Sequence, residues 1–435
     1  MLSKSEITKI LELLRSEAKA AVGGTEPMAI ALAVAKATEL LGCCPEKVVA
    51  KLSPKIIKNS VGVNVNGMDG AVGIPYAIAL GACYGKPEAE LDVLNHVTPD
   101  MLPAARKFID ERRYVLKQAH TFELIYVEIE ATGGGHEAKV IIAKSPTHFM
   151  FLKADDKILL DERWDLAKEY NRTHESWLNM KMIYDFAVEV PIDQLQFLLD
   201  GARLNKEIAH MAFNGQYGLG LGKMMKGSFE ERMVGQNTMP RMISYACAAC
   251  DVRMSGARIK VFCNSGSGNQ GIVGTLPLLI FAEETCVPES KLLRGLAMSM
   301  LTIIYIKHLL GNMSAHCSCV LASAGSACGL AYMLGGDYDA VVAAVKNNIA
   351  SLTGMVCDGA KPSCALRISG AVNGAFQSAM MAIEGICVPS TDGIIEDSVD
   401  RSLDNIANIG RDAMLENDSM ILRIITEKEG KEADN

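Results

Sequence analysis

The spacing of apolar side chains changes along the chain, and this change constrains the fold more than any other feature. Between residues 114 and 152 apolar and polar residues alternate, as in YVLKQAHTFELIYVEIEATG and EAKVIIA, and glycines at 133–135 separate these two segments. Such alternation predicts half-buried strands joined by a tight turn. From about residue 191 the apolar spacing is helical almost to the C-terminus. We therefore expect an α+β protein, with a small, mainly antiparallel sheet and helices in residues 1–190 and an all-helical portion in residues 191–435, the boundary being approximate.

The segment before the expected sheet alternates between apolar runs and glycine-rich turns. Residues 5–21 show helical spacing, residues 28–42 form a second, alanine-rich helical segment, and Gly-Gly-Thr-Glu-Pro at 23–27 forms the turn between them. The β-branched run KVVAKLSPKII at 47–57 predicts a strand. Residues 59–75 are rich in Gly and Asn and predict a long loop that leads into an apolar helix. Loops of that length are often functional.

The composition excludes several classes of protein. The net charge is −8 at pH 7 and no stripe of Lys and Arg is present, so we expect no nucleic-acid partner. The uncharged segment 317–336 is dominated by Ala, Ser, Gly and Cys, and it predicts a helix buried among other helices, with no membrane span. The charged N-terminus lacks the apolar stretch of a secretory signal. Thirteen cysteines without even spacing argue against a disulfide framework, so we expect a reducing, cytoplasmic environment.

Three cysteines in the C-terminal portion are the strongest candidates for chemistry. Cys317 lies in Ser-Ala-His-Cys-Ser-Cys at 314–319, and Cys357 and Cys364 enclose the loop sequence Asp-Gly-Ala-Lys-Pro-Ser. Three thiolates that converge on one pocket can hold an iron-sulfur cluster, which then keeps one iron open for a substrate. Zinc is the alternative metal, because His316 offers a fourth ligand. We therefore predict a metal site at these cysteines and, with it, an enzyme.

A glycine-rich turn at 264–271, Asn-Ser-Gly-Ser-Gly-Asn-Gln-Gly, opens the apolar helix IVGTLPLLIFAEE and is a candidate binding site. Free backbone N–H groups at a helix N-terminus favour an anion, and a small carboxylate is the expected guest. A plain turn with a helix cap is the alternative interpretation. The hydrogen-bonding side chains that this turn offers are Ser265, Ser267, Asn269 and Gln270.

Taken together, these motifs resemble those of the L-cysteine desulfidase family, whose members are also described as serine dehydratase alpha-subunit-like proteins. The resemblance extends along nearly the whole chain, and motifs in the same order make it specific. They are Gly-x-Thr-Glu-Pro at 23–27, a glycine loop ending in Gly-Ile-Pro at 73–75, Ser-Gly-Ser-Gly-Asn-Gln-Gly at 265–271, Ser-Ala-x-Cys-x-Cys at 314–319 and Cys-Asp-Gly-Ala-Lys-x-x-Cys at 357–364.

The resemblance implies an iron-sulfur lyase that works without pyridoxal phosphate. Members of the family eliminate hydrogen sulfide from L-cysteine to give pyruvate and ammonia, and the related iron-sulfur serine dehydratases act on L-serine. By the same resemblance Cys317, Cys357 and Cys364 hold a [4Fe-4S] cluster, and Cys319 is the alternative to Cys317 because the Cys-x-Cys pair aligns in two ways. The implied partner is a small amino-acid substrate. We expect a homodimer, because Met- and Ala-rich helices favour self-association.

One position departs from the family pattern. The family has Gly-Cys-Thr-Glu-Pro at the first turn, and its cysteine is the proposed active-site base, whereas this chain has Gly24 there. Thr25 and Glu26 remain as the candidate catalytic residues of this turn, and the base is unassigned. Glu26 is a candidate for binding the substrate ammonium, although a helix dipole alone also favours an acidic residue at this place. A catalytically impaired homologue that still binds an amino acid is therefore an alternative to an active lyase.

Overall fold

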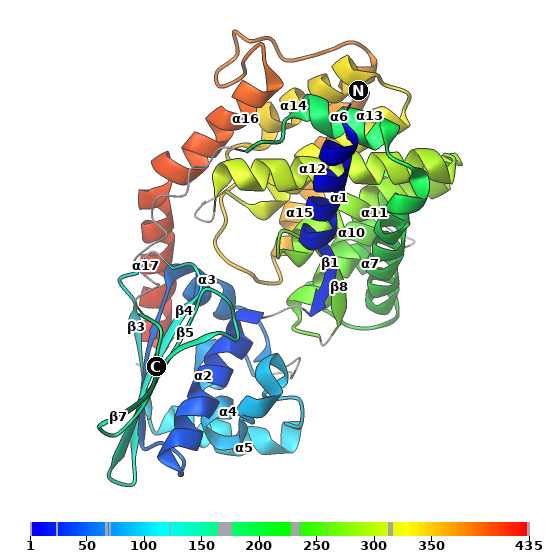
Figure 1. The fold of residues 1–435 in the computed structure, drawn as a ribbon. Coiled ribbons are helices and arrows are strands. Elements are labelled where there is room, and N and C mark those ends of the chain that lie inside the picture. Colours follow the sequence, from blue (N-terminus) through cyan, green and yellow to red (C-terminus); the bar gives the residue numbers. More distant parts are fainter. Residues whose placement is uncertain are drawn as a thin grey trace.

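The computed structural model describes residues 2–22, 25–65, 68, 71–121, 123–163, 176–227, 235, 237–257, 259–311 and 316–432. Figure 1 shows a sheet lobe (residues 25–163) and a helical lobe (residues 2–22 and 176–413). The expected α+β class is confirmed, with a small, mainly antiparallel sheet toward the N-terminus and mostly helices toward the C-terminus. The boundary near residue 190 stays a prediction.

The sheet lobe is built on six strands in the order β3-β2-β4-β5-β6-β7, and all neighbours are antiparallel except β2 and β3. The strands are β2 (Lys47–Leu52), β3 (Tyr114–Gln118), β4 (Tyr126–Gly133), β5 (His136–Ala143), β6 (Phe149–Ala154) and β7 (Lys157–Asp161). The expected hairpin turn joins β4 to β5, where Gly134 and Gly135 have φ angles of +59° and +82°. Such angles cost little only for glycine, which explains the turn sequence.

Helices cover one face of this sheet. They are α2 (Thr25–Leu41), α3 (Pro54–Ser60), α4 (Gly73–Tyr84) and α5 (Leu102–Asp110), with the short 3-10 turns η2 (Pro87–Asp92) and η3 (Pro99–Met101). α2 packs on β4 and β5, and α4 packs beside α2 (Figure 1). The strand expected over 47–57 is wrong beyond Leu52, because Pro54 occupies the first position of α3. Proline favours that position, since its fixed φ suits a helix and its missing N–H costs nothing there.

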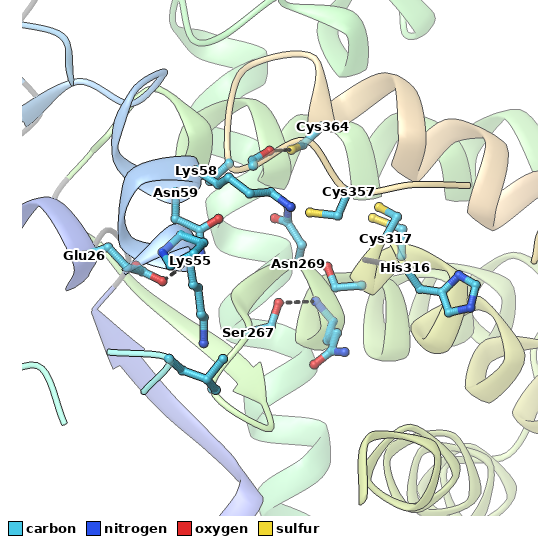
Figure 2. Close-up of a pocket in the computed structure, with 18 of the residues that line it drawn as sticks. Glu26, Lys55, Lys58, Asn59, Ser267, Asn269, His316, Cys317, Cys357 and Cys364 are labelled. Atoms are coloured by element: carbon cyan, nitrogen blue, oxygen red, sulfur yellow. Dashed lines mark hydrogen bonds between the residues drawn. The ribbon is translucent and has the colours of Figure 1, made fainter. Parts of the chain in front are cut away.

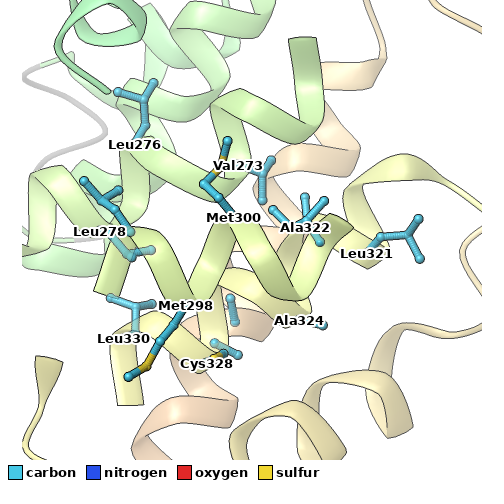
Figure 3. Close-up of a cluster of buried hydrophobic side chains, with 14 of the residues drawn as sticks. Val273, Leu276, Leu278, Met298, Met300, Leu321, Ala322, Ala324, Cys328 and Leu330 are labelled. Carbon is cyan, nitrogen blue, oxygen red and sulfur yellow. The ribbon is translucent and has the colours of Figure 1, made fainter. Parts of the chain in front are cut away.

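The helical lobe is a bundle packed around α11, α12, α13 and α15. Its helices are α1 (Lys4–Glu17), α6 (Met180–Glu189), η5 (Ile192–Leu195), α7 (Gln196–Asn214), α8 (Leu221–Met225), α10 (Thr238–Met254), α11 (Gly268–Thr285), α12 (Glu289–Leu310), α13 (Ser318–Met333), α14 (Tyr338–Leu352), α15 (Cys364–Ile383), α16 (Val399–Asn408) and η6 (Ile409–Ala413). Figure 3 shows side chains such as Val273, Met300 and Ala322 in contact in its centre.

The apolar helices of this lobe are core helices. The uncharged segment after Cys317 forms α13, which is buried as expected. Within the described part of the chain, α12 alone is long and apolar enough by composition to cross a membrane, but most of its length is buried inside the lobe. A helix that is apolar on all sides is what the centre of a bundle requires.

Two short strands correct the expectation for both portions of the chain. β1 (Ala18–Val22) and β8 (Lys260–Asn264) pair antiparallel within the helical lobe. The first helix therefore ends at Glu17 and not at residue 21, and the C-terminal portion is not purely helical. The alanine-rich segment becomes a strand because pairing with β8 outweighs its local helix preference. This pairing also fixes the start of the 264–271 turn, since Ser265 N donates to Glu17 O at 3.0 Å.

A last helix, α17 (Leu415–Glu432), connects the lobes from the outside (Figure 1). It follows η6 of the helical lobe and packs on α3 of the sheet lobe. Its Leu422 is 2% exposed and belongs to the apolar core of the sheet lobe. The C-terminal helix therefore holds the two lobes in one arrangement.

Candidate active site

A cavity of about 360 Å³ lies between the two lobes, a size typical of small-molecule sites. Thr25 does not line it but lies next to Glu26, which does, and Gly24 lies outside the described residues. Figure 2 shows the cavity wall. The residues singled out from the sequence that line it are Glu26, Ser265, Ser267, Asn269, Gln270, His316, Cys317, Cys319, Cys357 and Cys364.

Backbone pairing brings the cysteines of distant segments together. His316 forms an antiparallel bridge with Val356, and Cys317 N donates to the carbonyl of Met355 at 2.9 Å. This pairing sets Cys317, at the start of α13, beside Cys357. The cysteine loop (residues 357–364) then turns back, so that Cys364 at the start of α15 faces the same cavity.

The cysteine loop packs closely against α3 of the other lobe. Gly359 has a φ of +99°, and a Cβ there would lie 1.9 Å from the carbonyl oxygen of Lys58. Only glycine allows both the backbone angle and this approach. Figure 2 shows the Lys58 ammonium group pointing toward Cys357. Asp358 pairs with Lys361 at 2.7 Å and with Arg367, so the loop is also held from within.

The thiols of this wall differ in acidity. A hydrogen bond from the Cys319 thiol lowers the pKa of Cys317 to about 7, and the Arg367 guanidinium acts in the same direction. The pKa of Cys319 is raised, because its proton is held by Cys317 and it is buried. Burial also raises the pKa of Cys357. Among the described residues no group of three or more His, Cys, Asp or Glu side chains is close enough to hold a single metal ion.

The facing wall begins at the glycine turn of residues 264–271. Ser267 caps α11, since its Oγ accepts from Gln270 N at 3.4 Å, so the cap expected as the alternative is present. The same loop lines the cavity, and Ser265 adopts a φ of +46° there. One segment therefore both caps α11 and lines the cavity.

Arg253 and Gln270 are the polar groups of this wall that lack a full set of partners. Arg253 Nη1 donates to Asn269 Oδ1 at 3.1 Å, but its buried Nε has no partner in the described part of the chain. Gln270 is 2% exposed, and its Oε1 likewise has none there. Buried polar groups are normally hydrogen-bonded, so these two indicate a place for a ligand. The guanidinium suits a carboxylate, and the amide oxygen suits an N–H donor.

Glu26 approaches the cavity from the first turn of α2. Its Oε1 accepts from Asn59 Nδ2 at 3.0 Å, and its Oε2 accepts from Thr25 Oγ1 at 3.1 Å. Asn59 lies on α3, so the two helices orient this carboxylate together. A carboxylate accepts more than two hydrogen bonds, and Glu26 can therefore also bind an ammonium group.

Two lysines that sequence reasoning missed line the cavity. Lys307 lies in the last turn of α12, where its Nζ donates to the carbonyl of Gly311 at 3.0 Å, and Lys55 lies on α3. Burial, together with repulsion by Lys55, lowers the pKa of Lys307 to about 8. Pro54 as a helix start would have placed Lys55, Lys58 and Asn59 on one helical face. No sequence signal marks Lys307, Arg253 or Arg367.

The pattern that defines the serine dehydratase alpha chain family matches residues 88–423. The chain belongs to this family, and the resemblance recognised in its motifs is confirmed. At the level of the family, this membership indicates a lyase of amino-acid catabolism, in a group generally associated with iron-sulfur serine dehydratases.

Several curated bacterial proteins are similar to this chain over nearly its whole length. A "UPF0597 protein" of Bacteroides thetaiotaomicron is 48% identical over 429 residues, which is 98% of this chain and 99% of that protein. Proteins with the same name in Porphyromonas gingivalis and Oleidesulfovibrio alaskensis are 41% and 36% identical over 427 residues, 97% and 98% of this chain and 98% and 99% of theirs. These names specify no activity.

Proposed function

We propose that this protein is a cytoplasmic iron-sulfur lyase that eliminates hydrogen sulfide from L-cysteine and gives pyruvate and ammonia. One observation carries the proposal: cysteine thiols line one wall of a cavity whose other walls hold Arg253, Gln270 and Glu26. The first wall has the chemistry of a cluster site and the others that of an amino-acid site. The family supplies the reaction class.

The donor set fits a [4Fe-4S] cluster better than a single metal ion. Thiolate is the usual cluster ligand, and a cluster spreads its ligands further apart than one ion does. Cys317, Cys357 and Cys364 would hold it, with Cys319 as the alternative to Cys317. Lys58 and Arg367 would offset the negative charge of the thiolates. Zinc is less favoured, because the ring of His316 is directed away from Cys317 and Cys357 in Figure 2 and its Nε2 lies 3.1 Å from the carbonyl oxygen of Ile406.

The remaining residues would hold the substrate and exclude water. Arg253 and the N-terminus of α11 would bind the carboxylate, while Glu26 and the Gln270 oxygen accept from the ammonium group. Thr25 and Asn59 hold Glu26 in place. When bound, the cluster supplies a Lewis-acidic iron for the thiol that leaves.

The Cα proton needs a base, and Lys307 is our candidate. Lys307 lines the cavity near the 264–271 turn. Glu17 lies close to both, because its carboxylate favours the charged form of Lys307 and its backbone carbonyl accepts a hydrogen bond from Ser265 N. An amine with a pKa near 8 is neutral in an appreciable fraction at neutral pH, as a base must be. It would supply the function that Gly24 lacks. Loss of the proton and of the sulfur gives an aminoacrylate, which hydrolyses to pyruvate and ammonia.

Two alternatives to the L-cysteine lyase can be distinguished from it by experiment. The same residues can act on L-serine, which the family description favours, and a homologue without a working base would bind an amino acid without turnover. Protein prepared without oxygen is mixed with L-cysteine or L-serine, and sulfide, ammonia and pyruvate are measured. Equal amounts of sulfide and pyruvate from L-cysteine support the lyase. Turnover of L-serine alone supports the dehydratase, and binding without product supports the impaired homologue.

We also propose that the protein is a homodimer, without nucleic-acid or membrane partners. The net charge of −8 offers no field that would attract nucleic acid. Light scattering at several concentrations measures the mass, and a monomer at all of them would contradict the dimer.

A further inference from the structure

A second group of cysteines lies in the sheet lobe, and none of its members lines the cavity. Cys43 and Cys44 follow the end of α2, and Cys83 lies in the last turn of α4, the helix packed beside α2 (Figure 1). Cys44 is exposed and Cys83 is half-buried. Cys83 and Cys44 lie at neighbouring ends of two helices that run side by side, since a Cβ on Gly81 or Gly85 would lie against Ala31 or Ala35 of α2. The thiol of Cys83 acts there as a hydrogen-bond donor to Cys44.

Arg113 completes the surroundings of Cys44. Its Nη2 donates to the carbonyl of Pro45 at 2.7 Å and its Nε to that of Glu46 at 3.3 Å, and its guanidinium stacks on the ring of Phe108 at 4.8 Å. These contacts hold a fixed positive charge beside the thiol. The hydrogen bond from Cys83, with a smaller effect of Arg113, lowers the pKa of Cys44 to about 6. An exposed thiolate near arginine is the form of cysteine that reacts with oxidants.

We propose that Cys44 and Cys83 are a redox-active pair that closes to a disulfide when the protein meets a peroxide. The Cys44 thiolate attacks a peroxide oxygen, the O–O bond breaks, and hydroxide leaves, so that Cys44 becomes a sulfenic acid. The Cys83 sulfur then attacks the Cys44 sulfur, forms the S–S bond and expels the second oxygen as water with the Cys83 proton. The hydroxide takes up the proton that Cys44 lost when it ionised, so in total two thiols lose two electrons and one peroxide becomes two waters.

Cys83, and not the adjacent Cys43, is the partner that this geometry provides. Consecutive Cα atoms lie about 3.8 Å apart, which is shorter than disulfides normally span. Cys43 also faces the β4–β5 turn, because a Cβ at Gly134 would lie 3.2 Å from its sulfur. The raised pKa of Cys83 results mainly from the hydrogen bond to Cys44. This bond to a thiolate is lost when Cys44 is oxidised, so Cys83 then ionises more easily. This inference does not depend on the proposed lyase activity.

The test is peptide mapping of the full chain after limited treatment with hydrogen peroxide, with remaining thiols blocked under denaturing conditions. Trypsin releases Cys44 within residues 37–47 and Cys83 within residues 59–106. We expect a cross-link between these peptides that dithiothreitol removes. It should persist in Cys43→Ser and disappear in Cys44→Ser and in Cys83→Ser. No cross-link in the wild type, or its persistence in Cys44→Ser, would overturn the proposal.

Alkylation provides a second readout on protein that has never been oxidised. At pH 6 half of Cys44 is thiolate, whereas an ordinary thiol is almost fully protonated. After allowance for the weaker nucleophilicity of an acidic thiol, Cys44 should react with iodoacetamide about ten times faster than an ordinary exposed thiol. Cys83→Ser should slow this reaction. Equal rates at pH 6 in the wild type and in that variant would contradict the assigned hydrogen bond.

Discussion

Lys307 is the residue whose replacement best separates catalysis from folding. Lys307→Met keeps the apolar stem and removes a buried ammonium group, so the free energy of unfolding should stay the same or rise. Loss of a base should lower kcat by about 100-fold or more. The exposed Lys157→Met on β7 is the control, and it should change neither quantity. Unchanged turnover by Lys307→Met would show that another group takes the proton.

The pH dependence of the wild type follows from the same lysine. Its pKa is lowered to about 8, so the neutral amine becomes more abundant as the pH rises from 6 to 8. We therefore expect kcat/KM to rise about tenfold per pH unit below 8 and then to level off. Stopped-assay rates between pH 6 and 9 measure this limb, which Lys307→Met should lack. A flat profile in the wild type would contradict the assignment.

Among single residues, the sequence predicted the candidate side chains that lie within compact motifs. Cys357 and Cys364 enclose a loop sequence, and loop thiols can converge, while Cys317 lies in the compact Cys-x-Cys motif. Lys307 and Arg253 could not be found in this way, because each lies at the end of an apolar helix and only tertiary packing brings it to the cavity.

Among the elements, the start of α11 determines how Arg253 reaches a ligand. A Cβ on Gly268 would lie 2.3 Å from Arg253 Nε, so Gly268→Ala must displace the guanidinium. Alanine is otherwise favoured over glycine in a helix, by up to about 1 kcal/mol. We expect a KM about tenfold higher with little loss of stability. Gly370→Ala on α15, where a Cβ meets only Met355 at 3.7 Å, is the control and should leave KM unchanged.

Elements with a strong local pattern could be predicted, and those decided by contacts could not. The hairpin of β4 and β5 and the buried α13 followed from alternation and composition. The change from β2 to α3 was missed because β-branched residues continue past Pro54, although proline favours a helix start. β1 was missed because its alanine-rich sequence is extended only through pairing with β8.

For the whole molecule, α17 is the part that holds the lobes around the cavity. Leu422→Ala should lower the free energy of unfolding by about 2 to 4 kcal/mol, because it removes a buried side chain from the core of the sheet lobe. It should also raise KM, since α17 packs on α3, which carries Lys55, Lys58 and Asn59. Met420→Ala, 47% exposed on the same helix, should stay within about 0.5 kcal/mol of the wild type. Urea denaturation measures the free energy of unfolding of both variants.

This arrangement lay beyond sequence reasoning. The N-terminal α1 packs in the helical lobe, most of which is formed by later residues. Leu422, near the C-terminus, packs in the sheet lobe, which is formed by earlier residues. Hydrophobic periodicity shows that a helix has an apolar face, but it does not show which lobe covers that face. The cavity depends on this crossing, because its walls come from both lobes.

The most direct test of the account is the iron and acid-labile sulfide content of protein prepared without oxygen. We expect about four of each per wild-type chain, with a brown absorbance, as a [4Fe-4S] cluster requires. Cys357→Ser should lose the colour and most of the iron, whereas Cys328→Ser, buried among α12 and α13, should keep both. Wild-type protein without iron and sulfide, or Cys357→Ser with undiminished iron, would contradict a cluster at these cysteines.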